Sequence, residues 1–361
     1  MSLLSQYLTR LLFVRFLLLL FGMGAFMMGL DLMVNANSVM ADGDNALASL
    51  TRYILLRSPT IISDLIKIAA LLAGLLTLTF LIRHGELAAI WNSGVSQFGL
   101  VRRLIPLAII LGGLQFVIDD RVVPGSVEAL SDWGVVDDVG GRDRKGATAV
   151  TWIHVGSDIL RIPQTNIDPQ GLRNFTLFER DANGNLQARL DVGEARYRDG
   201  NWELRDITER RVAGGPVRHE ARRNWPVDLD VESLQHVLVH PRNLSLGQIL
   251  HFTDGDGQGT WAPYLYETWL YTKLSNCLVP FLMLFLSVTL AQQSQRAGRI
   301  EFLLLGGIVI GFSFFIFNGI TLAMGEVGML PPLVASSTPL LVFAAVAASV
   351  AFWHELKKAP S

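Results

Sequence analysis

The chain has 361 residues, of which 50% are hydrophobic and only 17% are charged. A soluble domain carries about 25% charged residues, so this composition excludes an ordinary soluble protein. The net charge of −2 gives no support to a nucleic-acid partner, and the single cysteine, Cys277, excludes an intrachain disulfide. Because most of the charged residues lie between positions 119 and 260, we predict an integral membrane protein with a polar insert.

Apolar runs on both sides of the insert predict membrane-spanning helices, since a helix needs about 20 apolar residues to cross the hydrocarbon core. The six candidate runs are residues 11–34, 61–82, 104–118, 270–291, 302–324 and 333–353. The third run is the shortest and would extend back to Leu100. The first run is longer than a signal-peptide core of about 7 to 15 residues, so we expect it to be retained. The sequence therefore predicts six spans, three before the insert and three after it.

The basic residues of the short loops predict the orientation, because Lys and Arg are enriched in cytoplasmic loops. One side collects Arg10, Arg15, Arg83, Arg102, Arg103, Arg296, Arg299, Lys357 and Lys358. The short loops of the opposite side hold only Arg52 and Arg57. We therefore expect both termini in the cytoplasm and the polar insert on the other side of the membrane.

The segment between the second and third spans, about residues 84–99, has an apolar face at helical spacing. That face contains Leu87, Ile90 and Trp91. Gly94 and Gly99 would end or bend the helix. Two interpretations stay open. The segment is either an interfacial helix on the membrane or a docking helix that fits a groove of a cytoplasmic partner, with Glu86 as a charged contact.

The polar insert contains short alternating segments that predict β-strands. The predicted strands are residues 148–155, 158–162, 172–180, 186–197 and 201–212. Gly and Asn at 183–185 and 199–201 favour hairpin turns, since these residues tolerate positive φ. Consecutive hairpins indicate an antiparallel sandwich or jelly roll. Residues 231–250 are predicted to be partly helical.

Catalytic motifs are absent from the sequence. There is no G-x-x-x-x-G-K-[ST] phosphate-binding loop, no G-x-S-x-G nucleophile elbow and no H-E-x-x-H zinc motif. The spans are nearly free of ionisable residues, which weakens a proton-coupled transport mechanism. We therefore predict no catalytic site, no metal and no cofactor, and expect that any transport energy comes from another chain.

Several short segments follow one another in an order that matches a known family. Residues 84–96 read HGELAAIWNSGVS, similar to the family stretch S-E-L-x-x-M-x-x-x-G-[VIF]-S. Further similar segments are WIHVG at 152–156, LRI at 160–162, PRNLS at 241–245, YETW at 266–269, LVP at 278–280, GIVIG at 307–311, Asn318, and LPP at 330–332 with Pro339. Through nearly its whole length the chain resembles the lipopolysaccharide-export permeases of the LptF/LptG (YjgP/YjgQ) type, with the G-type favoured.

The resemblance implies a fold and a location. The fold is a membrane α + β architecture of six transmembrane helices with an inserted periplasmic antiparallel β jelly-roll domain. The implied domains are residues 1–120 with the coupling helix, 121–262 for the β domain, and 263–361. The implied location is the bacterial inner membrane.

The resemblance also implies a function and partners. Two such permeases, LptF and LptG, pair with each other and bind a dimer of an LptB-type cytoplasmic ABC ATPase. The pair extracts lipopolysaccharide and passes it to LptC/LptA-type periplasmic bridge proteins. The implied ATPase-coupling residues are Glu86, Leu87, Ile90, Trp91 and Gly94. The first and fifth spans would form the lateral gate, and the implied cavity and gate residues are Met27, Leu30, Asp31, Met33, Lys67, Phe314, Asn318 and Thr321.

The first span departs from the family, whose members often have a basic residue there that meets the lipid phosphates, because its outer half offers Asp31 and no lysine. Lys67 would meet the phosphates instead, or it pairs with Asp64 three residues earlier on the same helix face. An alternative function from another class is a non-transporting envelope scaffold or sensor, in which a passive bundle holds a β interaction domain. Photocrosslinking to labelled lipopolysaccharide discriminates the two, because a scaffold gives no adduct.

Overall fold

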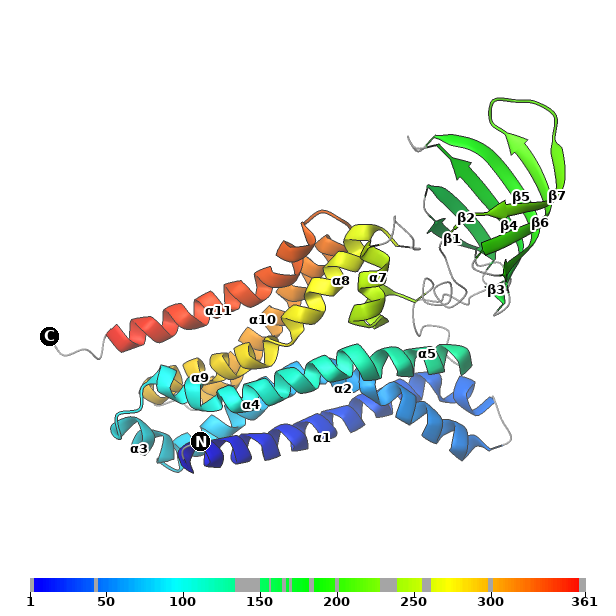
Figure 1. Cartoon of the computed structure of the whole chain (residues 1–361). Helices are drawn as coiled ribbons and strands as arrows, with labels where there is room; N and C mark the ends of the chain where they lie inside the picture. Colours follow the sequence, from blue (N-terminus) through cyan, green and yellow to red (C-terminus); the bar gives the residue numbers. More distant parts are fainter. Residues whose placement is uncertain are drawn as a thin grey trace. The chain divides into compact units, whose positions relative to one another are not determined.

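The computed structural model folds the chain into two compact units (Figure 1). It describes residues 3–41, 45–133, 150–155, 157–163, 167–168, 171–181, 185–198, 201–227, 239–254, 261–297 and 301–356. The helical unit comprises Met1–Leu130 and Thr268–Ser361, and the β unit comprises Ser131–Glu267.

Helices make up the helical unit on both sides of the insert, and all but the short α3 and α5 are at least 14 residues long. Those before it are α1 (Leu3–Ala41), α2 (Ala46–Arg83), α3 (Glu86–Asn92), α4 (Gln97–Val117) and α5 (Val123–Trp133). Those after it are α8 (Pro263–Asn276), α9 (Val279–Ala297), α10 (Glu301–Glu326) and α11 (Pro332–Leu356). α4 continues through a π-helical turn, η1 (Ile118–Val122), into α5. The helix that begins with the third span therefore extends well past residue 120.

Five of the described helices are long and apolar enough to cross a membrane, and α8 with α9 makes a sixth if this pair is counted as one span. Counted in this way, three spans precede the insert and three follow it, as predicted. The fourth span, predicted over residues 270–291, is corrected to two helices that meet at 48°. Pro280, the second residue of α9, favours the break because proline has no amide hydrogen to donate to a carbonyl oxygen of the preceding turn in α8.

α2 is the central helix of this unit. In its most apolar stretch 67% of the residues are buried, against 22% in α1, α10 and α11. Small residues allow the helices to approach closely. A Cβ on Gly307 of α10 would lie 2.1 Å from Leu75 Cδ1 of α2, and a Cβ on Gly112 of α4 would lie 2.4 Å from the Cys277 carbonyl oxygen at the break. α1 and α10 both pack against α2, yet much of their own surface stays exposed.

The β unit contains one curved antiparallel sheet (Figure 1). Its strands are β1 (Val150–Val155), β2 (Asp158–Pro163), β3 (Ile167–Asp168), β4 (Gly171–Arg180), β5 (Leu186–Arg198), β6 (Asn201–Arg211) and β7 (Arg218–Trp225). They pair in the order β1-β2-β4-β5-β6-β7, and β3 pairs with β4. The predicted fold class, a membrane helical bundle with an inserted antiparallel β domain, is confirmed. Among the described strands the order is that of a meander, and the crossovers that define a jelly roll are not among these pairings.

The five predicted strands correspond to β1, β2, β4, β5 and β6, with ends within two residues of the prediction. β7 is not predicted because its sequence, RHEARRNW, is charged and lacks an apolar alternation. The predicted turn residues 183–184 and 199–200 lie outside the described residues, although the flanking hairpins form. Of the predicted helical region 231–250, the structure describes a 3-10 turn at Pro241–Asn243 and the start of α7 (Leu246–Asp254), while residues 228–238 lie outside the described part.

Candidate functional site

The segment between α2 and α4 contains a short helix between two glycines. Gly85 (φ 72°) and Gly94 (φ 87°) take the left-handed conformation that glycine tolerates. α3 is therefore limited to seven residues. Ser96 caps α4 by accepting a hydrogen bond from the Gly99 amide at 3.0 Å. The predicted helix over residues 84–99 is thus corrected to α3 followed by the first turn of α4, and Gly99 lies inside that turn.

The apolar face of α3 packs against its own helical unit. Leu87 is fully buried and Ile90 is 9% exposed, while Trp91 packs half-buried against the same core. The face that was predicted to meet a membrane surface or a partner is therefore largely used within the chain. The half-exposed Glu86 and the exposed Gly94 remain accessible to a second protein.

The first turns of α1 lie against this segment, close to the N-terminus in Figure 1. The Tyr7 hydroxyl donates a hydrogen bond to Glu86 Oε2 at 2.9 Å, and the Ser5 hydroxyl donates to the Arg103 carbonyl oxygen at 2.9 Å. α1, α3 and α4 are thus joined at one end of the unit. Sequence reasoning missed Tyr7, because nothing near residue 7 indicates a partner 79 positions later in the chain.

Asp31 forms a polar clamp between α1 and α2. Arg57 Nη2 lies 3.1 Å from Asp31 Oδ1, and the Tyr53 hydroxyl donates to the second carboxylate oxygen. Asn35 Nδ2 donates to the Tyr53 hydroxyl oxygen at 3.2 Å. Tyr53 is fully buried and the Asp31 side chain is 17% exposed. The carboxylate that departs from the family pattern is therefore neutralised by the neighbouring helix.

The other residues predicted to line a cavity from α1 point away from the core. Met27, Leu30 and Met33 are 44%, 45% and 82% exposed. Since α1 and α2 are adjacent, these side chains occupy the face of α1 that α2 does not cover.

On α10 the residues predicted to line the cavity do not lie on the exposed face of the helix. Phe314 and Thr321 are buried and Asn318 is half-buried, and the Phe314 ring meets Phe343 of α11 edge-on with centroids 5.3 Å apart. The exposed apolar face of α10 contains Leu305, Ile308, Val309, Phe312, Ile316 and Ile320. Sequence reasoning missed these residues because α10 is apolar all round, and such a helix gives no signal of which face is free.

A buried polar cluster connects α2, α4, η1 and α8. Gln115 Nε2 donates to Asp119 Oδ2 at 2.8 Å and to Ser63 Oγ at 3.0 Å, and the Ser63 hydroxyl donates to Asp119 Oδ1. Lys273 Nζ donates to the Asp119 carbonyl oxygen at 2.7 Å. These ionisable residues lie at or near the ends of the predicted runs. Asp119 lies one residue beyond the predicted third run, and Lys273 lies within the fourth, 4% exposed.

Lys67, the candidate for a lipid phosphate, lies four residues after Ser63 and is half-buried on α2. Asp64, its alternative partner, is exposed. Arg52 lines a separate hollow of about 600 Å³ between α2 and α5. Arg52 lies in the first half of α2, as do the residues of α2 that bind Asp31, and Lys67 lies near the midpoint of α2. All of them are therefore far along α2 from α3, which follows the end of that helix.

Comparisons with known proteins agree with this architecture. The family described as lipopolysaccharide export system permease LptF/LptG matches residues 6–353. The chain is similar to the lipopolysaccharide export system permease protein LptG of Haemophilus influenzae, with 21% identity over 289 residues that cover 79% of this chain and 80% of that protein. It is also similar to LptG of Escherichia coli K12, with 22% identity over 306 residues that cover 81% and 82%. Both relatives are of the predicted G-type. The chain belongs to the LptF/LptG family of lipopolysaccharide export system permeases.

Proposed function

We propose that this chain is the permease subunit of an ABC-type exporter that extracts lipopolysaccharide from the inner membrane, powered by a separate cytoplasmic ATPase. The sequence contains no phosphate-binding loop of its own, which supports an external motor. The apolar spans support a membrane location, and the basic loops support cytoplasmic termini.

The observation that carries the proposal is the pair of open apolar faces on α1 and α10. Both helices pack against α2, and both leave large side chains such as Met33 and Phe312 exposed, by 82% and 66%. Paired with a related permease, the two faces would enclose a chamber with apolar walls. Each methylene moved from water into such surroundings gains about 0.8 kcal/mol, so a lipid with several acyl chains leaves the bilayer only if walls of this kind replace it.

The α3 end is the proposed contact with an LptB-type ATPase dimer. α3 is anchored in the core by Leu87, and Tyr7 connects Glu86 to α1. A displacement of α3 by the motor would therefore move α1 and α2 together with it. Such a rigid-body transfer is a recognised route for coupling between distant sites.

The β unit is the proposed exit for the lipid toward LptC/LptA-type bridge proteins. Its described strand order ends at β1 and β7. Edge strands carry unpaired backbone groups that accept a further strand. We place the handover of lipid at one of these edges.

Photocrosslinking tests the proposed function. A photoreactive residue at Met33 or Phe312 is expected to form an adduct with labelled lipopolysaccharide in the assembled complex, and addition of ATP is expected to remove it. The same residue at Ile109 of α4, which is 68% exposed, is the matched control because it is equally apolar and lies on neither gate helix. It is expected to contact ordinary lipid only.

The rival function, a passive envelope scaffold or sensor, gives the opposite result. It predicts no lipopolysaccharide adduct at Met33 or Phe312, or one that ATP does not change. Either outcome would overturn the exporter proposal.

A further inference from the structure

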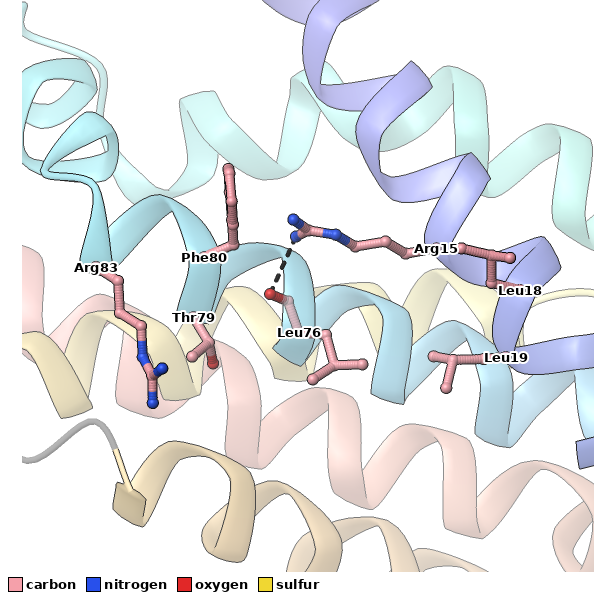
Figure 2. A pocket seen from close by; sticks show the side chains of 7 residues that line it. All are labelled: Arg15, Leu18, Leu19, Leu76, Thr79, Phe80 and Arg83. Carbon is pink, nitrogen blue, oxygen red and sulfur yellow. Dashed lines mark hydrogen bonds between the residues drawn. The ribbon is translucent and has the colours of Figure 1, made fainter. Parts of the chain in front are cut away.

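α1, the first of the two proposed gate helices, is bound to its neighbours by polar contacts at three levels. Near its start, the Tyr7 hydroxyl donates to Glu86 of α3. Figure 2 shows the Arg15 side chain reaching from α1 to α2, where its Nη1 donates to the Leu76 carbonyl oxygen at 3.0 Å. Toward the other end of α1, Asp31 forms the polar clamp with α2. We therefore expect α1 to move only together with α2.

α10, the second proposed gate helix, has fewer polar contacts with its neighbours. Among its described side chains, only that of Glu326, the last residue of the helix, forms a hydrogen bond with another helix. Its Oε1 accepts from Trp269 Nε1 of α8 at 3.0 Å. The hydroxyls of Ser313 and Thr321 donate to carbonyl oxygens of α10 itself. One hydrogen bond at the end of the helix is thus the described polar contact of α10 with the rest of the unit.

The first half of α10 packs closely on α2. A Cβ on Gly311 would lie 2.5 Å from Leu71 Cδ2, and Gly307 packs in the same way against Leu75. Because later residues of α10 meet earlier residues of α2, the two helices are antiparallel, and the last turn of α10 lies away from α3. The close contacts at the two glycines fix the first half of α10, so a swing of this helix would displace its last turns most.

The last turn of α10 packs against α8 and α11 with no space for a side chain at Gly325. A Cβ there would lie 2.6 Å from Ala335 Cβ of α11 and 3.0 Å from Thr268 Cγ2 of α8. Thr268 is fully buried and Trp269 is 8% exposed. Lys273, one turn further along α8, donates to a carbonyl oxygen of η1. α8 is therefore anchored by its own contact with η1 and offers the end of α10 a fixed partner.

We propose that the hydrogen bond between Trp269 and Glu326 is a latch that holds the lateral gate closed, and that α10 is the wall of the gate that moves. The proposal rests on the proposed function, in which α1 and α10 form the gate. Opening the latch would free the last turns of α10 to swing about Gly307 and Gly311, together with the apolar face around Phe312. Both latch groups tolerate release, because tryptophan is stable at a membrane–water interface and water there can bind the carboxylate.

A cargo-independent measurement tests the latch first. In a Cys277→Ser background, the thiol of a Thr268→Cys variant is buried while the latch is closed, so its rate of reaction with a maleimide reports opening. Trp269→Phe keeps an aromatic ring but removes the donor, and it is expected to raise this rate about five-fold. Thr272→Val is the matched control, because it removes a hydrogen bond within α8 and leaves the latch intact. It is expected to change nothing.

Glu326 provides a comparison that separates the latch from a general loss of packing. Glu326→Gln keeps an acceptor oxygen for the indole and is expected to stay within about two-fold of the parent rate. Glu326→Ala removes the acceptor and is expected to match Trp269→Phe. The two substitutions together should add nothing to either alone, because both remove the same bond. Additive effects, or an equal rise in Thr272→Val, would overturn the proposal.

A disulfide between α8 and α10 tests whether the latch must open for transport. Thr268→Cys and Gly325→Cys are close enough to be bridged, since a Cβ on Gly325 lies 3.0 Å from Thr268 Cγ2. Ala335→Gly is added to make space for the new Cβ. In the assembled complex the oxidised variant is expected to lose the lipopolysaccharide adduct at Phe312, and reduction to restore it. An oxidised variant that still forms the adduct would overturn the latch.

The two readouts distinguish a failure of the latch from a failure of the proposed function. Absence of a lipopolysaccharide adduct in every variant, with faster reaction of Thr268→Cys in Trp269→Phe, would contradict the exporter function while the movement of α10 stands. A normal adduct in the parent, with no effect of Trp269→Phe on the reaction rate, would support the exporter and overturn the latch.

Discussion

Glu209 of β6 is a buried carboxylate that two arginines stabilise. The carboxylate is 3% exposed. Arg211 Nε donates to its Oε1 at 2.6 Å and Arg223 Nη2 donates to its Oε2 at 2.5 Å. These hydrogen bonds, first that of Arg211 and then that of Arg223, hold the pKa of Glu209 below its ordinary value. The charge is therefore part of the folded β unit.

Replacement of Arg223 by Met is expected to destabilise the β unit by about 2 kcal/mol, because it leaves a buried carboxylate with one donor fewer. Hydrogen exchange of the β6 and β7 amides in the full-length protein measures the loss. Arg210→Met, on the same sheet but exposed and without a described partner, is the matched control and should have little effect. Equal losses for the two variants would contradict the assignment.

Acidification provides a second measurement at the same site. Since the folded pKa of Glu209 is lowered, its contribution to stability is complete above the ordinary value of 4.5 and is lost as the pH falls through the folded value. Burial raises the pKa of Glu179, so that group acts in the opposite direction and offsets part of the loss. Glu209→Gln is expected to reduce the acid sensitivity of the β6 amides.

Tyr7 is expected to position Glu86 for the proposed ATPase contact. Tyr7→Phe removes the 2.9 Å hydrogen bond to Glu86 Oε2 and frees the carboxylate to change rotamer. The Kd for the ATPase should rise by about five-fold, the equivalent of about 1 kcal/mol. Glu86→Ala should cost more, because it removes the charge itself.

Titration of the detergent-solubilised permease with the ATPase measures these constants. Tyr271→Phe, at a half-buried tyrosine of α8, is the control. Unchanged binding in both Tyr7→Phe and Glu86→Ala would remove this end of α3 from the contact.

At the scale of helices, the buried polar cluster holds α2, α4 and α8 together around the broken fourth span. η1 is a π-helical turn, a feature that occurs often at functional positions, and its Asp119 is the acceptor for side chains from three elements. Polar contacts between spans are effective because the alternative is an unsatisfied group in hydrocarbon.

Gln115→Leu is expected to destabilise the helical unit by about 1 to 3 kcal/mol, because Asp119 and Ser63 lose a buried donor. Thermal unfolding in detergent measures the change. Thr77→Val is the matched control, since Thr77 is 1% exposed and its hydroxyl has no partner among the described residues. That variant should be neutral or stabilising, and a larger loss there than in Gln115→Leu would contradict the role of the cluster.

At the scale of the whole molecule, the proposed orientation places α3 in the cytoplasm and the β unit outside it. In a Cys277→Ser background, Val212→Cys is expected to react with an impermeant maleimide in intact spheroplasts. Asn92→Cys should react only after the membrane is opened. Both positions are exposed in the folded chain, so a difference in labelling by the maleimide reports the side of the membrane on which each residue lies. The reverse pattern would contradict the orientation.

The sequence by itself determined the membrane class, the set of spans, five strands and the family. Each of these depends on local properties: the length of an apolar run, the alternation along a strand, or a short motif such as that around Glu86. It also singled out Gly94 as a residue that would end or bend the helix, and Gly94 takes the positive φ that glycine tolerates, although the predicted helix extended to about residue 99 and α3 ends at Asn92.

The tertiary structure decided what depends on contacts between distant residues. Apart from Asn35 and Gln115, which lie one helical turn from Asp31 and Asp119, the side-chain partners of Asp31, Glu86 and Asp119 lie between 22 and 154 positions away in the chain, and no local pattern encodes such pairs. The free face of α10 was likewise undetermined, because a helix that is apolar on every side buries whichever face its neighbours cover. The apolar face of α3, read from its spacing, proved to belong to the core for the same reason: burial is a property of the packed molecule, and periodicity only shows which residues share a face.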